Sequence, residues 1–326
     1  MKSNWIFAIL FITLIACGRD QAEERVEEEE LREVPEFNAD SAYSFIQRQV
    51  DFGPRVPNTE AHQETKRWLV EKFNEYGMQV TEQDFEAKAY DGTNLKLTNI
   101  FAAHNPQASK RILLAAHWDT RHLADKDTEN IEQPIDGAND GGSGVGVILE
   151  IARVIATSGM DPEVGVDFIL FDGEDYGEPE QTKPSDRNHS QIWWALGSQH
   201  WSRNPHEAGY SAYYGILLDM VGAKGARFYR EGYSMQYARN IVQKVWRNAH
   251  RLGHGDFFPM RDSHEIIDDH VFVNQVAKIP MIDIVEYSPD YGFGKYHHTH
   301  QDSMDLIDRR TLKAVGETVL FTIYQE

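Results

Sequence analysis

Five short apolar runs, each rich in branched side chains, recur along the chain at residues 95–103, 111–116, 166–171, 216–220 and 281–285. Runs of this length and composition are typical of buried strands. Segments with helical spacing separate or follow them, near residues 145–156, 235–249, 270–276 and 310–324, and a helix over 61–76 precedes a further strand over 78–85. This alternation predicts an α/β domain with three layers, in which helices flank a central mixed, largely parallel sheet.

Composition excludes several other classes of protein. Hydrophobic residues make up 41% of the 326 residues, which is enough for a sizeable core and too many for a disordered chain. The formal net charge of −20 argues against general attraction to nucleic acid or anionic lipid. The single cysteine excludes an intrachain disulfide and a Cys-rich zinc site, so any metal must be bound by His, Asp or Glu.

The N-terminus predicts an exported protein. An apolar stretch from Trp5 to Ala16 is too short to span a bilayer, and Leu14-Ile15-Ala16-Cys17 resembles the lipobox of bacterial lipoproteins. We therefore expect a signal peptide over 1–16, lipidation of Cys17, and a glutamate-rich spacer over 17–36 that is extended or forms a solvated helix. Residues 37–326 would form a single catalytic domain, tethered to the membrane by lipid on the periplasmic side or at the cell surface.

Polar residues follow the predicted strands at the point where each strand ends. His117 directly follows the run over 111–116, and Asp219 directly follows Leu218. Asp175 is the last residue of the polar cluster after the run over 166–171, and His298 follows the last predicted strand through a Gly-rich loop. Asp140 lies in a turn that opens a helix. Because ligands bind beyond the carboxyl ends of strands in α/β sheets, these side chains are expected to converge. Two imidazoles and three carboxylates suit Zn²⁺, so the pattern predicts a metal site.

These motifs carry a family resemblance from about residue 50 to the C-terminus. His117-Trp118-Asp119-Thr120, the turn over 137–142, the cluster over 172–175, Leu218-Asp219-Met220 and His298-Thr299 resemble the zinc-dependent aminopeptidase superfamily. The resemblance implies that the metal ligands are His117, Asp140, Asp175, Asp219 and His298. It also implies that Glu174, directly before a ligand, is the general acid/base.

Three features resemble one branch of that superfamily, the glutaminyl-peptide cyclotransferases of the animal type. Asp268 lies in Asp268-Asp269-His270, where aminopeptidases usually have a serine, and in the cyclases that aspartate shares a hydrogen-bond network with the residues matching Glu174 and Asp219. An insertion over 176–194 precedes Leu196-Gly197-Ser198, and it ends in two tryptophans. The candidate substrate-binding residues are Trp193, Trp194, Trp118 and Phe293, with a core role for the paired tryptophans as the alternative.

Two departures from the animal enzymes bear on this resemblance. His297 stands where they commonly have tryptophan before the last ligand, and Asp175 replaces a glutamate. Asp175 followed by Tyr176-Gly177 resembles the bacterial exported members of the branch.

The resemblance implies an enzyme that converts the N-terminal glutamine of peptides and proteins into pyroglutamate and releases ammonia. Its catalytic residues would be Glu174, Asp219 and Asp268, and one Zn²⁺ per site would be held by Asp140, Asp175 and His298. The alternative is an aminopeptidase that binds a second zinc through His117 and Asp219, and a remote alternative is a non-catalytic binding module. Peptides are the expected partners, nucleic acid is not, and the sequence leaves the oligomeric state open.

Overall fold

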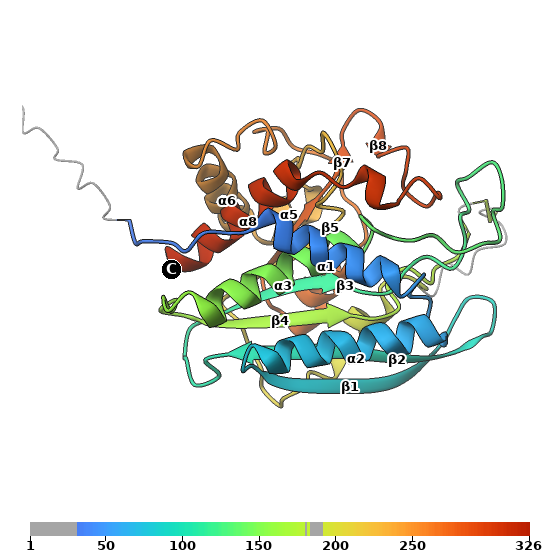
Figure 1. The fold of residues 1–326 in the computed structure, drawn as a ribbon, viewed down its shortest axis with the longest axis horizontal. Coiled ribbons are helices and arrows are strands. Elements are labelled where there is room, and N and C mark those ends of the chain that lie inside the picture. Colours follow the sequence, from blue (N-terminus) through green and yellow to red (C-terminus); the bar gives the residue numbers. More distant parts are fainter. Residues whose placement is uncertain (1–30, 180, 183–191) are drawn as a thin grey trace, which may run out of the picture. The chain divides into compact units, whose positions relative to one another are not determined.

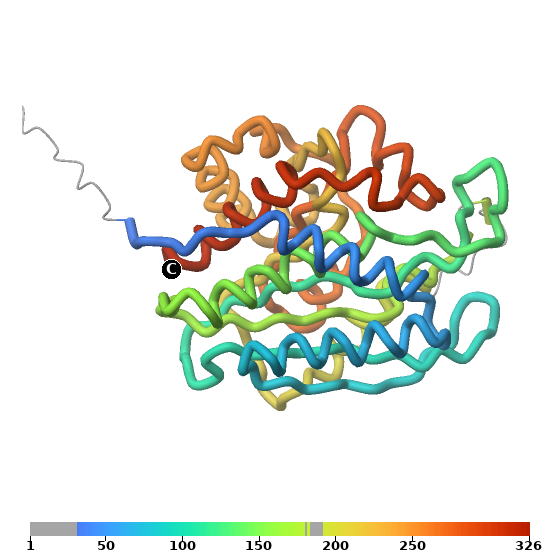
Figure 2. The backbone as a smooth tube through the Cα atoms, in the orientation of Figure 1, coloured from blue at the N-terminus to red at the C-terminus, as the bar shows by residue number. Residues whose placement is uncertain are grey.

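The computed structural model describes residues 31–179, 181–182 and 192–326. The predicted signal peptide, Cys17 and most of the predicted spacer lie outside the described residues. Residues Arg32–Glu326 form one compact unit. The two ends of this unit lie side by side, because Arg32 and Gln325 exchange two hydrogen bonds of 3.0 Å (Figure 2).

The centre of the unit is a six-stranded sheet with the strand order β1-β2-β4-β3-β5-β6 (Figure 1). The four strands β4, β3, β5 and β6 are parallel, while β2 runs antiparallel to both β4 and β1. The predicted mixed, largely parallel sheet is therefore confirmed. Its strands are β1 (Gln79–Lys88), β2 (Asn94–His104), β3 (Arg111–His117), β4 (Gly165–Phe171), β5 (Tyr214–Asp219) and β6 (Met281–Val285).

Helices cover both faces of this sheet, as the three-layer prediction requires. Alternate strand residues such as Leu114 and Phe168 join one core cluster, while their neighbours Leu113 and Ile169 join another with Trp201 on the opposite face. The first face carries α1 (Ala39–Asp51), α2 (Glu60–Glu75), α3 (Gly142–Thr157), α6 (Arg239–Arg251) and α8 (Arg309–Tyr324). The other carries α4 (Leu196–Arg203) and α7 (Asp269–Phe272).

Two helical predictions need correction. The helix expected over 235–249 is broken at Ala238, so that α5 (Gly232–Tyr237) and α6 are separate helices. The helix expected over 270–276 is a single α-helical turn, α7, that continues as a π-helix from Val273 to Ala277. Two short strands, β7 (Tyr287–Ser288) and β8 (Gly292–Phe293), pair outside the main sheet. None of the helices in the described part is both long and apolar enough to cross a membrane.

Candidate functional site

The carboxyl edge of the parallel strands collects most of the predicted site residues. His117 is the last residue of β3 and Asp219 the last of β5, while Glu174 and Asp175 follow the end of β4 after a short turn. Because these strands are neighbours in the parallel part of the sheet, their ends meet at one edge. Asp140 reaches the same place from the turn that precedes α3.

Asp140, Asp175 and His298 come together around one point. The imidazole Nε2 of His298 lies 3.2 Å from Asp175 Oδ1 and 3.7 Å from Asp140 Oδ2. All three side chains are at most 5% exposed. His298 therefore lies next to both of the carboxylates that are expected to hold one zinc with it.

A second group shares Asp140 with the first. His117 Nε2 lies 3.0 Å from the Oδ1 atom of Asp140 and 3.2 Å from that of Asp219, and the ligand atoms of these three residues lie within 4.8 Å of one another. Asp140 therefore presents one oxygen to His117 and the other to His298. This is the geometry in which a carboxylate can bridge two metal ions.

Glycine is required where Asp140 approaches the end of β3. Gly141 has a φ of +76°, and a Cβ atom there would lie 2.8 Å from the carbonyl oxygen of Asp119 and 2.9 Å from His117 Cε1. A side chain would thus be strained by its backbone conformation and would also collide with backbone. The glycine at this position lets the turn bring Asp140 against His117.

The side chains at this point fit a zinc ion. Within the described part of the chain, neither carboxylate oxygen of Asp175 has a hydrogen-bond partner, although both are buried. Buried carboxylates are normally satisfied, so a cation between Asp175, Asp140 and His298 accounts for these atoms. Two carboxylates and one imidazole, with a fourth position left open, match the donor set of catalytic zinc. His298 Nδ1 faces Asp125 Oδ1 at 3.7 Å, the side on which zinc-binding histidines usually have a carboxylate.

Glu174 lies beside these residues and has the properties of a proton carrier. Burial of its carboxyl group raises its pKa well above the usual value, and the charge of Asp268 adds to the rise while His117 opposes it. Burial also raises the pKa of Asp219 to about 7, against the lowering effect of its bond to His117. Carboxyl groups with raised pKa values can exchange protons near neutral pH.

Asp268 begins a chain of buried acidic groups that continues away from the site. It caps α7 by accepting a hydrogen bond from the backbone N–H of Asp269, and it contacts Asp283 on β6. His270 Nδ1 lies 3.8 Å from Asp283 Oδ2, and its Nε2 lies 3.1 Å from Glu231 Oε2. Glu231 accepts further bonds from the backbone N–H groups of Tyr233, Ser234 and Ile266. Asp268 is thus joined to a buried network that the sequence did not reveal.

Two other buried carboxylates hold the backbones of the candidate ligands. Asp119 accepts the N–H groups of Glu174 at 3.0 Å and Asp175 at 3.1 Å. Asp302 accepts those of Asn139 at 2.7 Å and Asp140 at 3.0 Å. Burial and the charge of Asp140 raise the pKa of Asp302 to about 8, although these two N–H bonds oppose the rise.

The sequence alone assigned no role to Asp119 or Asp302. Asp119 could have been noticed as part of the His117-Trp118-Asp119 motif, and Asp302 as an acid four residues after His298. Which backbone groups each one binds depends on long-range contacts that no local pattern encodes.

Aromatic rings line one side of the candidate ligands. Trp194 stacks parallel to His298 at a centroid distance of 5.8 Å, and Phe293 stacks on His297 at 4.1 Å. His297 also accepts a hydrogen bond at Nδ1 from Lys126, and its Nε2 lies 3.8 Å from Asp140 Oδ2. Trp193 is half-buried. These positions leave Trp193, Trp194 and Phe293 as candidate substrate contacts, with His297 as an unexpected neighbour.

Trp118 requires a correction. Its side chain is fully buried, stacks on His62 at 4.3 Å, and donates a hydrogen bond from Nε1 to the carbonyl oxygen of Thr98. It has no surface left for a substrate. Its role is to support the end of β3 from within the core.

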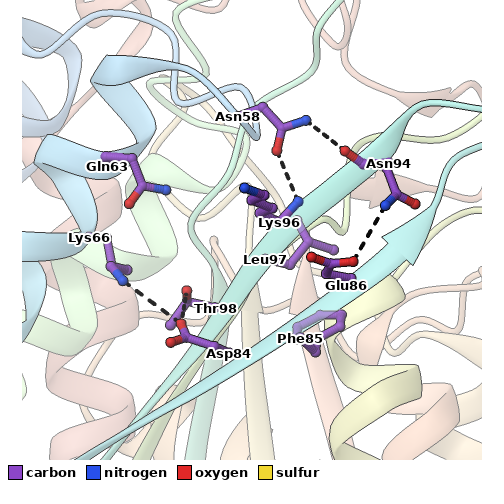
Figure 3. Close-up of a pocket in the computed structure, with 10 residues that line it drawn as sticks. All are labelled: Asn58, Gln63, Lys66, Asp84, Phe85, Glu86, Asn94, Lys96, Leu97 and Thr98. Carbon is purple, nitrogen blue, oxygen red and sulfur yellow. Dashed lines mark hydrogen bonds and ion pairs between the residues drawn. The ribbon is translucent and has the colours of Figure 1, made fainter.

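A separate groove of about 780 Å³ lies between α2 and strands β1 and β2 (Figure 3). Its polar groups already bind one another: Asn58 pairs with the backbones of Asn94 and Lys96, and Thr98 donates to Asp84. None of the candidate catalytic or metal-binding residues lines it. The groove therefore gives no second site of comparable chemistry.

Comparison with known proteins places these observations in one family. Residues 99–323 match the model of Peptidase family M28. Aminopeptidase YwaD of Bacillus subtilis (strain 168) is 25% identical over 260 residues, which are 76% of this chain and 48% of the relative, so the chain spans about half of that protein's length.

Two crystal structures are more similar over their whole length. The glutaminyl cyclase of Bacteroides thetaiotaomicron, bound to N-acetylhistamine, is 49% identical with a TM-score of 0.86, over 90% of this chain and 100% of that one. A Zn-dependent exopeptidase from Parabacteroides distasonis is 47% identical with the same TM-score and coverage. The relatives thus carry both of the activities expected from the sequence.

Proposed function

The chain belongs to Peptidase family M28, and we propose that within this family it is a zinc-dependent glutaminyl-peptide cyclotransferase. It would convert the N-terminal glutamine of peptides and proteins into pyroglutamate and release ammonia. The observation that carries the proposal is Asp268, a buried carboxyl group close enough to Glu174 and Asp219 to raise the pKa of each. The 49% identity to a bacterial glutaminyl cyclase supports the same function.

Asp140, Asp175 and His298 would hold the zinc ion. When bound there, Zn²⁺ supplies Lewis-acid polarisation of the γ-carboxamide of the substrate. The three buried side chains fix its place at the edge of the sheet. His117 and Asp219 stay available for hydrogen bonds within the site or for a second ion.

Glu174 performs the proton transfer. The α-amino nitrogen of the substrate attacks the γ-carboxamide carbon of the same residue, the bond from that carbon to the amide nitrogen breaks, and ammonia leaves. Glu174 takes a proton from the attacking nitrogen and delivers it to the departing one, a role typically worth about 10²–10⁴-fold in rate. Its raised pKa suits both halves of this task. Burial and the charge of Asp268 keep that pKa high, and Asp268 and Asp219 need not contact the substrate.

The aromatic residues would enclose the glutamine side chain. Trp194 lies next to His298, and Phe293 reaches the same side through His297. Rings in these positions exclude water from the reacting amide. Trp193 is the third candidate for this wall.

One observation favours a second candidate function. The group formed by His117, Asp140 and Asp219 could hold another zinc ion, as an aminopeptidase with two metals needs for water activation. The exopeptidase relative at 47% identity points the same way. Cyclisation needs no attacking water, so one zinc is sufficient for the first candidate.

Paired substrates test the proposal directly. Purified protein, with zinc quantified, should release ammonia and pyroglutamate from peptides that begin with glutamine and leave peptides that begin with leucine or alanine intact. Free leucine or alanine, with no pyroglutamate, would instead establish the aminopeptidase. Asp140→Ala should lose both zinc and turnover.

The cellular location is a further part of the proposal. The N-terminal pattern supports export, cleavage before Cys17 and attachment of lipid to that residue, with the catalytic domain over 37–326 on the periplasmic side or at the cell surface. The full-length chain should fractionate with membranes and carry a lipid mass at Cys17. Cys17→Ser should release it into the soluble fraction, and an unchanged membrane fraction would refute the anchor.

A further inference from the structure

Arg55 lies far in sequence from the candidate ligands, in the loop between α1 and α2, yet its guanidinium group is fully buried beside them. Nε donates to the carbonyl oxygen of Trp118 at 3.1 Å. The two terminal nitrogens donate to the carbonyl oxygens of Asp136 and Gly137, each at 2.7 Å. One side chain therefore joins the turn after β3, which carries Asp119, to the turn that carries Asp140.

The charges of both carboxylates that hold the ligand backbones also act on this guanidinium group. The charges of Asp302 and Asp119 stabilise the Arg55 cation against the cost of its burial, which lowers its pKa to about 10. The group is therefore still charged at neutral pH. Asp119 binds the N–H of Asp175 and Asp302 binds the N–H of Asp140, so Arg55 interacts electrostatically with both of these supports.

We propose that Arg55 is a positioning residue that sets the spacing between the proposed zinc ligands Asp140 and Asp175 by bonding to both turns. It acts on the ligands only through their backbones and does not touch the metal or the substrate. A planar guanidinium group with five donors can bind three carbonyl groups in two directions, which a lysine ammonium cannot reproduce. Arg55 lies outside residues 99–323 that match the family model. The inference rests on the ligand set of the proposed function.

Two substitutions test this role, measured on the full folded domain. Arg55→Lys keeps the charge and Arg55→Met removes it. Zinc affinity is measured by competition with a chromophoric chelator, and ligand geometry by the visible spectrum of the Co²⁺-substituted protein. Substitutions around the ligands of a metal typically cost about 10- to 100-fold in affinity. We expect a loss in this range for Arg55→Met, a smaller loss for Arg55→Lys, and an altered Co²⁺ spectrum in both.

Arg111 provides a matched control at the opposite end of the same strand. It begins β3, where it donates to the carbonyl oxygen of Asn105 at 2.7 Å and to Asp167 Oδ2 at 2.7 Å. Arg111→Lys and Arg111→Met should lower the melting temperature and leave zinc affinity and the Co²⁺ spectrum unchanged. This separates a general loss of stability from a loss of ligand spacing.

The outcomes distinguish this inference from the proposed function. If Arg55→Lys has the zinc affinity and Co²⁺ spectrum of the original protein, the positioning role is refuted, and this variant decides the question should Arg55→Met fail to fold. If Asp140→Ala retains full zinc, the proposed ligand set itself is wrong. Cyclisation of glutamine peptides is measured separately. If the protein proves to be an aminopeptidase and the Arg55 variants still lose zinc affinity, the proposed cyclotransferase function is wrong and the positioning role of Arg55 stands.

Discussion

At the scale of single residues, the site is a group of carboxyl groups whose pKa values differ in direction, some lowered and some raised. Burial opposes ionisation of Asp140, but its hydrogen bond to His117 and the charge of that imidazole outweigh burial and hold its pKa below the usual range. Glu174 has no such bond to another described residue, and burial raises its pKa. Neighbouring acids whose environments push their pKa values apart suit different roles, here the proposed roles of ligand for Asp140 and proton carrier for Glu174.

Glu174→Gln tests this division of roles. The amide keeps the size of the side chain but cannot accept the proton from the attacking nitrogen, so kcat should fall by about 10²-fold or more. Zinc content should stay at the level of the original protein because Glu174 is not among the three proposed ligands. Steady-state kinetics and elemental analysis measure the two effects, with Glu129→Gln on the exposed loop as the control. A variant with normal turnover would remove Glu174 from the mechanism.

Glu231 gives a prediction of pH dependence at a buried carboxyl group away from the metal. Burial alone would raise its pKa, but the bonds from His270 and Ser234 prevail and lower it from the usual 4.5 to about 2. Because the pKa is lower in the folded protein, the ionised group stabilises the fold at pH values above its pKa in the unfolded chain, about 4.5. This stabilisation is lost as the pH falls from 4.5 toward 2. Glu231→Gln should therefore cost about 3 kcal/mol at neutral pH, at ~1.4 kcal/mol per pKa unit.

Denaturation with urea at a series of pH values measures this cost. The stability difference between the two proteins should shrink as the pH is lowered below 4.5. Glu36→Gln, at an exposed position, should show no such trend. A difference that is constant with pH would show that the ionised form of Glu231 is not what stabilises the fold.

At the scale of elements, the sequence predicted the parallel strands well because each is a short apolar run that is buried on both faces. Met281–Val285 has the predicted boundaries, and Gly165–Phe171 differs by one residue. The candidate ligands could be found for the same reason, since each follows such a run or opens the helix after one. The break at Ala238 could not be found, because apolar residues continue at helical spacing through it. Arg55 could not be found either, since its partners lie more than 60 residues away.

The contact between α3 and β5 supplies a prediction for an element. A Cβ atom on Gly144 would lie 2.0 Å from the carbonyl oxygen of Leu218, next to Asp219. Neither the strand nor the helix can move freely, so Gly144→Ala should destabilise the protein by about 1–3 kcal/mol or more. Scanning calorimetry should show the loss as a lower melting temperature. Thr157→Ala, at the exposed end of the same helix, should change the melting temperature little, and equal effects of both substitutions would contradict the close contact.

At the scale of the whole molecule, the fold tolerates an unusual concentration of negative charge. Asp and Glu outnumber Lys and Arg by 52 to 32. Several of these acids are buried at one edge of the sheet, among them Asp140, Asp175, Asp219 and Asp268. Like charges at close range in a medium of low dielectric repel one another, so this edge depends on protons and cations for its stability. We therefore expect zinc to stabilise the fold of the proposed enzyme as well as to take part in its chemistry.

Removal of zinc should therefore destabilise the protein near neutral pH. Binding to the folded state alone stabilises by about 4 kcal/mol when free zinc exceeds its dissociation constant about 1,000-fold. In a domain of this size a change of about 1 kcal/mol shifts the melting temperature by about 2–4 °C, so chelation should lower it by roughly 10 °C. Adding zinc back should restore both the melting temperature and turnover. Asp140→Ala serves as the matched control, because it lacks the shared ligand and should respond little to the chelator. A zinc-free protein that melts at the original temperature would show that protons and Arg55 alone neutralise this edge, and the metal would then act only in catalysis.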